Sequence, residues 1–158
     1  MDVSPDYEDL FKSLNAHKVK YLVVGAQAVI FHTEPRWTKD MDVWIPSELN
    51  DPEKVFAALK DFGASLVNIV PDDFRNKKMF LQIGVAPVRI DILVGLEGAK
   101  ATRAWQNRRR TFYGKTPIYV MGVRDVYRTK RSAGRSQDLL DMEKLLQWYP
   151  RELRKLSD

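Results

Sequence analysis

The pattern of hydrophobic and polar positions predicts helices and strands that alternate along the chain. Hydrophobic residues three and four positions apart are typical of an amphipathic helix, and short apolar runs that end at glycine or proline indicate strands. The predicted helices are one that opens at Pro5 behind an N-cap at Ser4, and others at 26–32, 52–62, 99–107, 123–131 and from 136 onward. The predicted strands are 21–24, 40–45, 79–84, 88–94 and 117–121. Helices precede, interrupt and follow the strands, so the predicted fold class is α/β (α+β), with a mixed central β-sheet flanked by helices.

Two local features of this pattern make sharper predictions. Residues 86–87 are Ala-Pro and separate the strands at 79–84 and 88–94, which indicates a hairpin or near-hairpin. The last helix takes Ser136 as its N-cap, and four apolar residues recur along one of its sides. We expect that side to be buried, with Leu139, Met142, Leu145 and Leu146 against the core.

Length and composition indicate one cysteine-free globular domain. The 158 residues fit a single domain, with a core at about 19–121 and a C-terminal helical part at about 122–158 packed on it. The absence of cysteine excludes disulfides, thiolate zinc sites and cysteine nucleophiles, and it fits a reducing compartment. No apolar run approaches the ~20 residues of a membrane span, and the N-terminus is acidic. We therefore expect a soluble, cytoplasmic protein with no membrane partner.

Charge is distributed unevenly along the chain. The 26 basic and 21 acidic residues give a net charge of +5. The segment 100–135 contains eleven basic residues and one acid, for a net charge of +10, so the remainder carries −5. A segment of this kind favours a phosphorylated ligand or a nucleic acid as partner, and Arg108, Arg109 and Arg110 could contact an RNA backbone. The alternative is a solvated basic face.

Three acidic residues are candidates for metal chemistry. Asp40 and Asp42 lie two residues apart in an extended segment, so both side chains project from one face. In the strand at 88–94 the same alternation leaves Arg89 and Asp91 opposite an apolar face. Two carboxylates about 4 Å apart repel by ~4 kcal/mol at an effective dielectric near 20. Three converging acids therefore need a proton or a cation, and Mg²⁺ prefers such oxygen ligands together with substrate phosphates.

A glycine turn precedes this acid pair. The strand at 21–24 stops at Gly25, and the helix that follows has unsatisfied N–H groups at its start. Such a helix start can bind phosphate. It lies 15 residues before Asp40, so one helix and one turn could bring the phosphate site and the acids together.

Taken together, these residues resemble a known superfamily. The stretch VVGAQAVIFH, then Arg36, Thr38, Asp40 and Asp42, and Asp91 on a later strand, is similar to the DNA polymerase beta type nucleotidyltransferases. The pattern G-A-Q-A through R-x-T-x-D-x-D and the C-terminal KRSAGRSQDLLDMEKL resemble the AbiEii type of bacterial nucleotidyltransferase, several of which are toxins of toxin–antitoxin pairs. The resemblance covers about 19–147. Gly25-Ala26 departs from the Gly-Gly or Gly-Ser of many members.

The resemblance implies a role for each residue of the acid cluster and the turn. Asp40 and Asp42 would hold Mg²⁺ (or Mn²⁺) against the phosphates of an NTP. Asp91 would complete the site on the acceptor side and accept the proton of the attacking hydroxyl. Gly25 and Ala26 would offer backbone donors to the triphosphate. Gln27 would contact phosphate or ribose, or serve only as a surface residue.

Further residues of the matching patterns would support the site. Arg36 would pair with phosphate or brace the carboxylates, and Thr38 lies with it on the approach to the acid pair. Lys130 matches the lysine of the family and would reach the β- or γ-phosphate. An ionic bracket that docks the last helices would comprise Arg135, Asp138 and Asp141. The two aspartates could instead be ordinary acids near a helix N-terminus.

The implied fold and activity are those of a nucleotidyltransferase. It would move a nucleoside monophosphate from an NTP to a hydroxyl acceptor and release pyrophosphate. The acceptor could be the 3′ end of a tRNA, another RNA, a protein or a small molecule, and the protein could be a toxin with a cognate antitoxin. The alternative is a catalytically silent module that retains the fold and binds a partner or a polyanion, as an antitoxin-like protein would.

Overall fold

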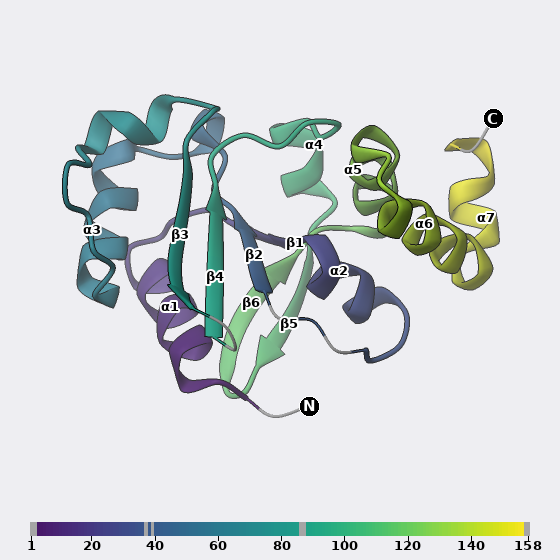
Figure 1. The fold of residues 1–158 in the computed structure, drawn as a ribbon, viewed down its shortest axis with the longest axis horizontal. Helices are drawn as coiled ribbons and strands as arrows, with labels where there is room; N and C mark the ends of the chain where they lie inside the picture. The colour runs from purple at the N-terminus through teal and green to yellow at the C-terminus, as the bar shows by residue number, and fades with distance from the viewer. Residues whose placement is uncertain (1–2, 37, 39, 86–87, 157–158) are drawn as a thin grey trace.

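The centre of the protein is a six-stranded mixed sheet in the order β3-β4-β2-β1-β6-β5 (Figure 1). The computed structural model describes residues 3–36, 38, 40–85 and 88–156. The strands are β1 Leu22–Val24, β2 Asp40–Trp44, β3 Phe80–Val85, β4 Val88–Leu93, β5 Arg109–Tyr113 and β6 Thr116–Val120. The predicted fold class is confirmed, and five of the six strands match the predicted ones to within two residues at either end.

Pairing in the sheet combines parallel and antiparallel neighbours. β1 runs antiparallel to β2 and parallel to β6, while β2 runs parallel to β4. β3 and β4 pair antiparallel, as a hairpin requires, although residues 86–87 themselves lie outside the described residues. β5, which pairs antiparallel with β6, was not predicted. Its sequence RRTFY shows no buried alternation, because this edge strand is stabilised by its ladder with β6 rather than by an apolar face.

Helices cover the sheet in two groups. They are α1 Pro5–Ala16, α2 Gly25–His32, α3 Pro52–Phe62, α4 Ala101–Gln106, α5 Val123–Ala133, α6 Ser136–Trp148 and α7 Pro150–Leu153. In Figure 1, α1 and α3 lie at one end of the molecule, whereas α5, α6 and α7 gather at the other end beside α2. The hydroxyl of Ser4 accepts a hydrogen bond from the backbone N–H of Tyr7, which confirms the predicted N-cap. None of the described helices is long and apolar enough to cross a membrane.

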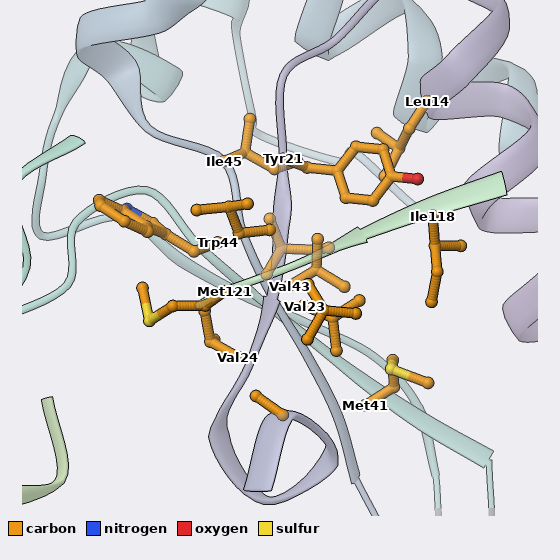
Figure 2. Close-up of a cluster of buried hydrophobic side chains, with 14 of the residues drawn as sticks. Leu14, Tyr21, Val23, Val24, Met41, Val43, Trp44, Ile45, Ile118 and Met121 are labelled. Atoms are coloured by element: carbon orange, nitrogen blue, oxygen red, sulfur yellow. The ribbon is translucent and has the colours of Figure 1, made fainter. Parts of the chain in front are cut away.

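The hydrophobic core lies between the central strands and the helices that cover them. Figure 2 shows Val23 of β1 and Val43 of β2 beside Ile118 of β6, with Trp44 and Met121 at the edge of the cluster. The indole N–H of Trp44 donates to the carbonyl of Val94 at 3.2 Å, so this buried ring is part of the core. This core fixes the positions of β2 and β4, which carry the acidic residues Asp40, Asp42 and Asp91, and of β1, which leads into the turn at Gly25.

The orientation of α6 differs from the prediction. Leu145 is buried and Met142 and Leu146 are half-buried, but Leu139 is 56% exposed, so its predicted burial is wrong. Asp138 and Asp141 face inward instead, at 1% and 2% exposure. The helix also begins one residue earlier than the predicted N-cap implies, because Arg135 rather than Ser136 is its N-cap. The reason is electrostatic: cations on neighbouring elements bind both aspartates, and this rotates the helix away from its most apolar side.

Candidate active site

The three predicted acids converge on one face of the sheet, on the neighbouring inner strands β2 and β4. The parallel register of β2 and β4 places Asp42 directly beside Asp91, and Asp40 projects from the same face as Asp42. One carboxylate oxygen from each of the three residues lies within 4.8 Å of the others. Asp91 is 8% exposed. The structure therefore brings together on adjacent strands the acids that lie about 50 positions apart in the sequence.

Gly25, the residue directly after β1, lies against this acid cluster. Val24 pairs with Asp42 across the sheet, so the next residue turns immediately over the carboxylate. Gly25 has a φ of +65°, and a Cβ at this position would overlap Oδ2 of Asp42. Both the backbone conformation and the close approach require glycine. α2 begins here without a side-chain cap, so its first N–H groups remain free of side-chain acceptors beside the acids.

The electrostatics of the cluster favour the uptake of a cation. Burial, followed by the charges of Asp91 and Asp40, raises the pKa of Asp42 to about 7. Arg89 supplies a partial counter-charge, with its guanidinium 2.8 Å from Asp40 and 3.7 Å from Asp91. Gln82 of β3 donates to Asp91 at 3.2 Å. Among the described residues, Arg89 is therefore the one cation in ion-pair contact with the three carboxylates, and the charge of Lys130 acts on Asp42 from further away.

The donor set fits a hard divalent cation. Oδ1 of Asp40 is buried and has no hydrogen-bond partner among the described residues, which is costly for a carboxylate oxygen. Carboxylate oxygens are the ligands that Mg²⁺ and Mn²⁺ prefer. Asp40, Asp42 and Asp91 could therefore hold such an ion.

Two chambers open on either side of Asp42. The apolar chamber, of about 240 Å³, lies on the Asp91 side, where Phe80, Leu93 and Leu96 form much of its wall. The polar chamber, of about 440 Å³, lies on the Asp40 side and is lined by charged or polar groups and by the α2 start. These lining residues are Gly25, Ala26, Arg36, Thr38, Asp40, Asp42, Lys130, Arg135, Gln137, Asp138 and Asp141. The acid cluster lies between the two chambers, because both are lined by Gly25, Asp42, Lys130, Arg135 and Asp138.

An ionic bracket joins α5 and α6 to the chambers. Lys130, which is 8% exposed, lies 3.2 Å from Asp138 and 3.0 Å from Asp141. Arg135 contacts Asp138 at 2.7 Å, and Arg36 contacts Asp141 at 3.2 Å. Burial alone would raise the pKa of Asp138, but hydrogen bonds from Arg135 and Lys130 outweigh burial and lower it. The aspartates are therefore paired structural acids and not merely helix-terminal charges.

The remaining predicted residues take varied positions. Ala26 and Thr38 line the polar chamber, whereas Gln27 is half-buried on α2 and lines neither chamber. Arg36 contacts Asp141 and does not brace Asp40 or Asp42. Arg89 takes that bracing position instead.

Sequence reasoning assigned no role to Arg89 or to Gln82. Arg89 could have been found, because it stands two positions before Asp91 on one strand and therefore shares its face. Gln82 could not, because its contact depends on the register of β3 with β4.

Comparisons with known proteins identify the fold. No family model matches the sequence, and no curated protein does. Among solved structures, a candidate nucleotidyltransferase from Thermotoga maritima is 14% identical with a TM-score of 0.59, over 92% of this chain and 96% of that one. The lincomycin-bound lincosamide adenylyltransferase LnuA is 15% identical with a TM-score of 0.56, over 92% of this chain and 98% of that one. ANT(2″)-Ia in complex with adenylyl-2″-tobramycin is 9% identical with a TM-score of 0.59, over 95% of this chain and 91% of that one. The chain therefore has a nucleotidyltransferase fold.

Proposed function

We propose that the protein is a Mg²⁺-dependent nucleotidyltransferase, which transfers a nucleoside monophosphate from an NTP to a hydroxyl group. The observation that carries this proposal is the convergence of Asp40, Asp42 and Asp91 beside the turn at Gly25. A partly buried acid cluster with one ion-paired cation, next to the first N–H groups of a helix, is suited to binding a metal–triphosphate complex. The similarity of fold to antibiotic adenylyltransferases supports the same reaction class.

The reaction forms one bond and breaks another at the α-phosphorus of the NTP. The acceptor oxygen bonds to the α-phosphorus, and the bond from this phosphorus to the bridging oxygen breaks, so pyrophosphate leaves. Asp40, Asp42 and Asp91 would hold Mg²⁺ or Mn²⁺. When bound there, such an ion would supply neutralisation of phosphate charge and polarisation of the phosphoryl group. Asp91, on the side of the apolar chamber, accepts the proton of the attacking hydroxyl.

Other groups of the chain orient the triphosphate in the polar chamber. The backbone N–H groups of Gly25 and Ala26 lie at the start of α2 and would donate to phosphate oxygens. Lys130 and Arg36 line this chamber, although both are held by buried aspartates in the free protein. Their charges therefore contribute to the potential of the chamber, and a direct phosphate contact requires an exchange of partners.

The acceptor that we propose is a terminal hydroxyl of RNA, such as the 3′ end of a tRNA. The net charge of +10 over 100–135 supports a polyanionic acceptor. Such an activity would make the protein a toxin of the AbiEii type with a cognate antitoxin, as the matching patterns at 25–42 and 130–145 suggest. Induced expression should then arrest growth of a host cell, and the Asp42→Asn variant should not.

A label-transfer experiment tests the proposed reaction. The protein is incubated with Mg²⁺ and each α-labelled NTP in turn, together with total RNA, total protein or a hydroxyl-bearing small molecule. We expect label to enter RNA and the signal to vanish with Asp42→Asn. Asp72→Asn is the matched control, because that side chain is 81% exposed and lies outside both chambers. The absence of transfer with every NTP and acceptor class would contradict the proposal.

A silent module that only binds partners is the second candidate function. The observation in its favour is Arg89, whose guanidinium already lies 2.8 Å from Asp40 and partly neutralises the cluster. Calorimetric titration with Mg²⁺ and an NTP separates the two functions. An active enzyme binds the pair with an affinity that Asp42→Asn abolishes, whereas a silent module shows no such binding.

A further inference from the structure

A second pocket lies away from the acid cluster, where the end of α1 meets α4 and the β5–β6 hairpin. This Trp105 pocket has a volume of about 370 Å³ and is lined chiefly by Asn15, Lys18, Lys20, Trp105, Arg110 and Tyr119. It shares no lining residue with the apolar or the polar chamber. None of its lining residues is acidic. The pocket therefore combines aromatic rings with cations and has no carboxylate of its own.

The aromatic side of the pocket is held in place. The rings of Trp105 and Tyr119 meet with centroids 5.4 Å apart, and Tyr119 in turn contacts Tyr21 at 5.9 Å. Tyr21 is fully buried, so these rings are anchored on the core. Arg108 stacks with its guanidinium 4.0 Å from the centroid of Trp105, and it donates a hydrogen bond to the carbonyl of Trp105 at 2.7 Å. The rings of Trp105 and Tyr119, inclined at 60° to each other, thus form an anchored aromatic platform in the pocket, whereas Arg108 holds the Trp105 ring without lining the pocket itself.

The cations of the pocket differ from those beside the chambers. Lys18, Lys20 and Arg110 are exposed, and within the described part of the chain none of them forms an ion pair. Lys130 and Arg36, by contrast, are held by buried aspartates. Three cations around one pocket without an acidic partner create a positive potential that an external anion can neutralise.

We propose that the Trp105 pocket binds an unpaired nucleotide of a single-stranded nucleic acid. A base stacks on the aromatic platform of Trp105 and Tyr119, and the adjoining phosphates contact the three cations. Stacking on aromatic rings and guanidinium planes beside a cationic groove is how proteins hold unpaired nucleotides. An acidic peptide would use the cations but leave the platform without a matching planar group. Binding itself is independent of the proposed function, and only the interpretation of this strand as the acceptor rests on it.

Binding of labelled oligonucleotides tests the proposal. Fluorescence anisotropy is measured with a short fluorescein-labelled uridine oligoribonucleotide, its thymidine DNA counterpart and an RNA duplex of equal length, over a range of salt concentrations. We expect both single strands to bind more tightly than the duplex. The difference between the two single strands shows whether the pocket favours RNA or DNA.

Two variants separate the cations from the platform. The combined variant Lys18→Gln, Lys20→Gln and Arg110→Gln should reduce the slope of log K against log salt by about 2, since each single-strand phosphate contact contributes roughly 0.7. Trp105→Leu should weaken binding about tenfold and leave that slope unchanged, because stacking is not ionic. Because Trp105→Leu could disturb packing, its thermal unfolding is compared with that of the wild type, and the charge variant provides an independent test.

The matched control changes the same charge elsewhere. Lys54, Lys60 and Lys78 are exposed and form no ion pair among the described residues, and they lie outside this pocket. If their combined replacement by glutamine lowers the slope equally, the pocket is not the binding site and the proposal is wrong. Equal binding of duplex and single strands, or a folded Trp105→Leu protein with unchanged affinity, would also overturn it.

Failure of this proposal is distinct from failure of the proposed function. Asp42→Asn should abolish nucleotide transfer and leave oligonucleotide binding unchanged. A protein that binds the oligonucleotide and transfers nothing would overturn the proposed function alone. A protein that labels an acceptor but does not bind single strands would overturn the Trp105 pocket alone.

Discussion

Two neighbouring groups of acids, one buried and one partly buried, differ in how far their charge is neutralised by cations. Asp138 and Asp141 on α6 are contacted by Lys130, Arg135 and Arg36, and these contacts lower the pKa of Asp138. The acid cluster on β2 and β4 has one arginine for three carboxylates, and the pKa of Asp42 rises to about 7. Acids that the fold neutralises hold helices together. Acids that the fold does not fully neutralise can bind a cationic ligand.

The strongest test of this contrast is the loss of Asp42. Asp42→Asn should reduce nucleotide transfer by at least about 10³-fold, equivalent to about 4 kcal/mol in the barrier, because a carboxylate of the metal site is removed. The folded structure should persist, since the variant also removes charge repulsion. Initial rates of label transfer and a circular dichroism melt measure the two effects. A variant with near-normal rates would place the reaction elsewhere.

The pH dependence of metal-free stability sharpens the same contrast. The folded pKa of Asp42, about 7, exceeds its ordinary value of 3.8, so the folded chain binds this proton more tightly than the unfolded chain. Its contribution to stability is full below pH ~4 and is lost as the pH rises through 7, by up to about 4 kcal/mol.

Urea unfolding in the presence of EDTA, between these pH values, measures this loss. Asp42→Asn should flatten the decline, whereas Asp72→Asn should not change it. The predicted direction would be wrong if the unfolding free energy of the metal-free wild type rose between pH 4 and 7 and that of Asp42→Asn did not.

Loss of a paired acid should act on folding. Asp138→Ala leaves Lys130 buried with Asp141 as its remaining acidic partner, and breaking a buried ion pair costs about 3 kcal/mol. Urea denaturation measures the fall in unfolding free energy. Asp72→Ala serves as the control, since its contact with Arg75 is on the surface. An unchanged midpoint would show that the bracket contributes nothing to stability.

Replacement of Arg89, the cation in direct ion-pair contact with the cluster, should have the smallest effect. Arg89→Gln should strengthen Mn²⁺ binding about tenfold, because the guanidinium repels a divalent ion and neutralises the acids that would bind it. Calorimetry with Mn²⁺ gives the affinity, and Arg75→Gln, with a side chain 67% exposed in the wild type, is the control. Weaker Mn²⁺ binding in Arg89→Gln would mean that the arginine orients the ligands rather than competing with the metal.

Local spacing was sufficient to predict most elements and the shared face of Asp40 and Asp42. The alternation of side chains along a strand places Asp40 and Asp42 on one face, and a glycine that ends an apolar run indicated the turn at Gly25. These predictions succeeded because the period of a strand and the stereochemistry of glycine are properties of a few neighbouring residues.

Pairing between distant segments was beyond such reasoning. The edge strand β5 has no hydrophobic pattern of its own, and the burial of Leu139 was predicted wrongly because α6 turns its aspartates inward. Arg36 forms an ion pair with Asp141 rather than with Asp40 or Asp42, since the partner of a charged group depends on which surfaces pack together.

The sequence by itself determined where the acidic residues, the glycine turn and the basic residues lie along the chain, because composition and short-range periodicity depend only on neighbouring residues. The tertiary structure decided which charges meet. The parallel register of β2 with β4 put Asp91 beside Asp42, and the docking of α5 and α6 neutralised Asp138 and Asp141. Charge balance in a folded protein is a property of contacts across elements, and such contacts follow from long-range packing rather than from neighbours in the chain.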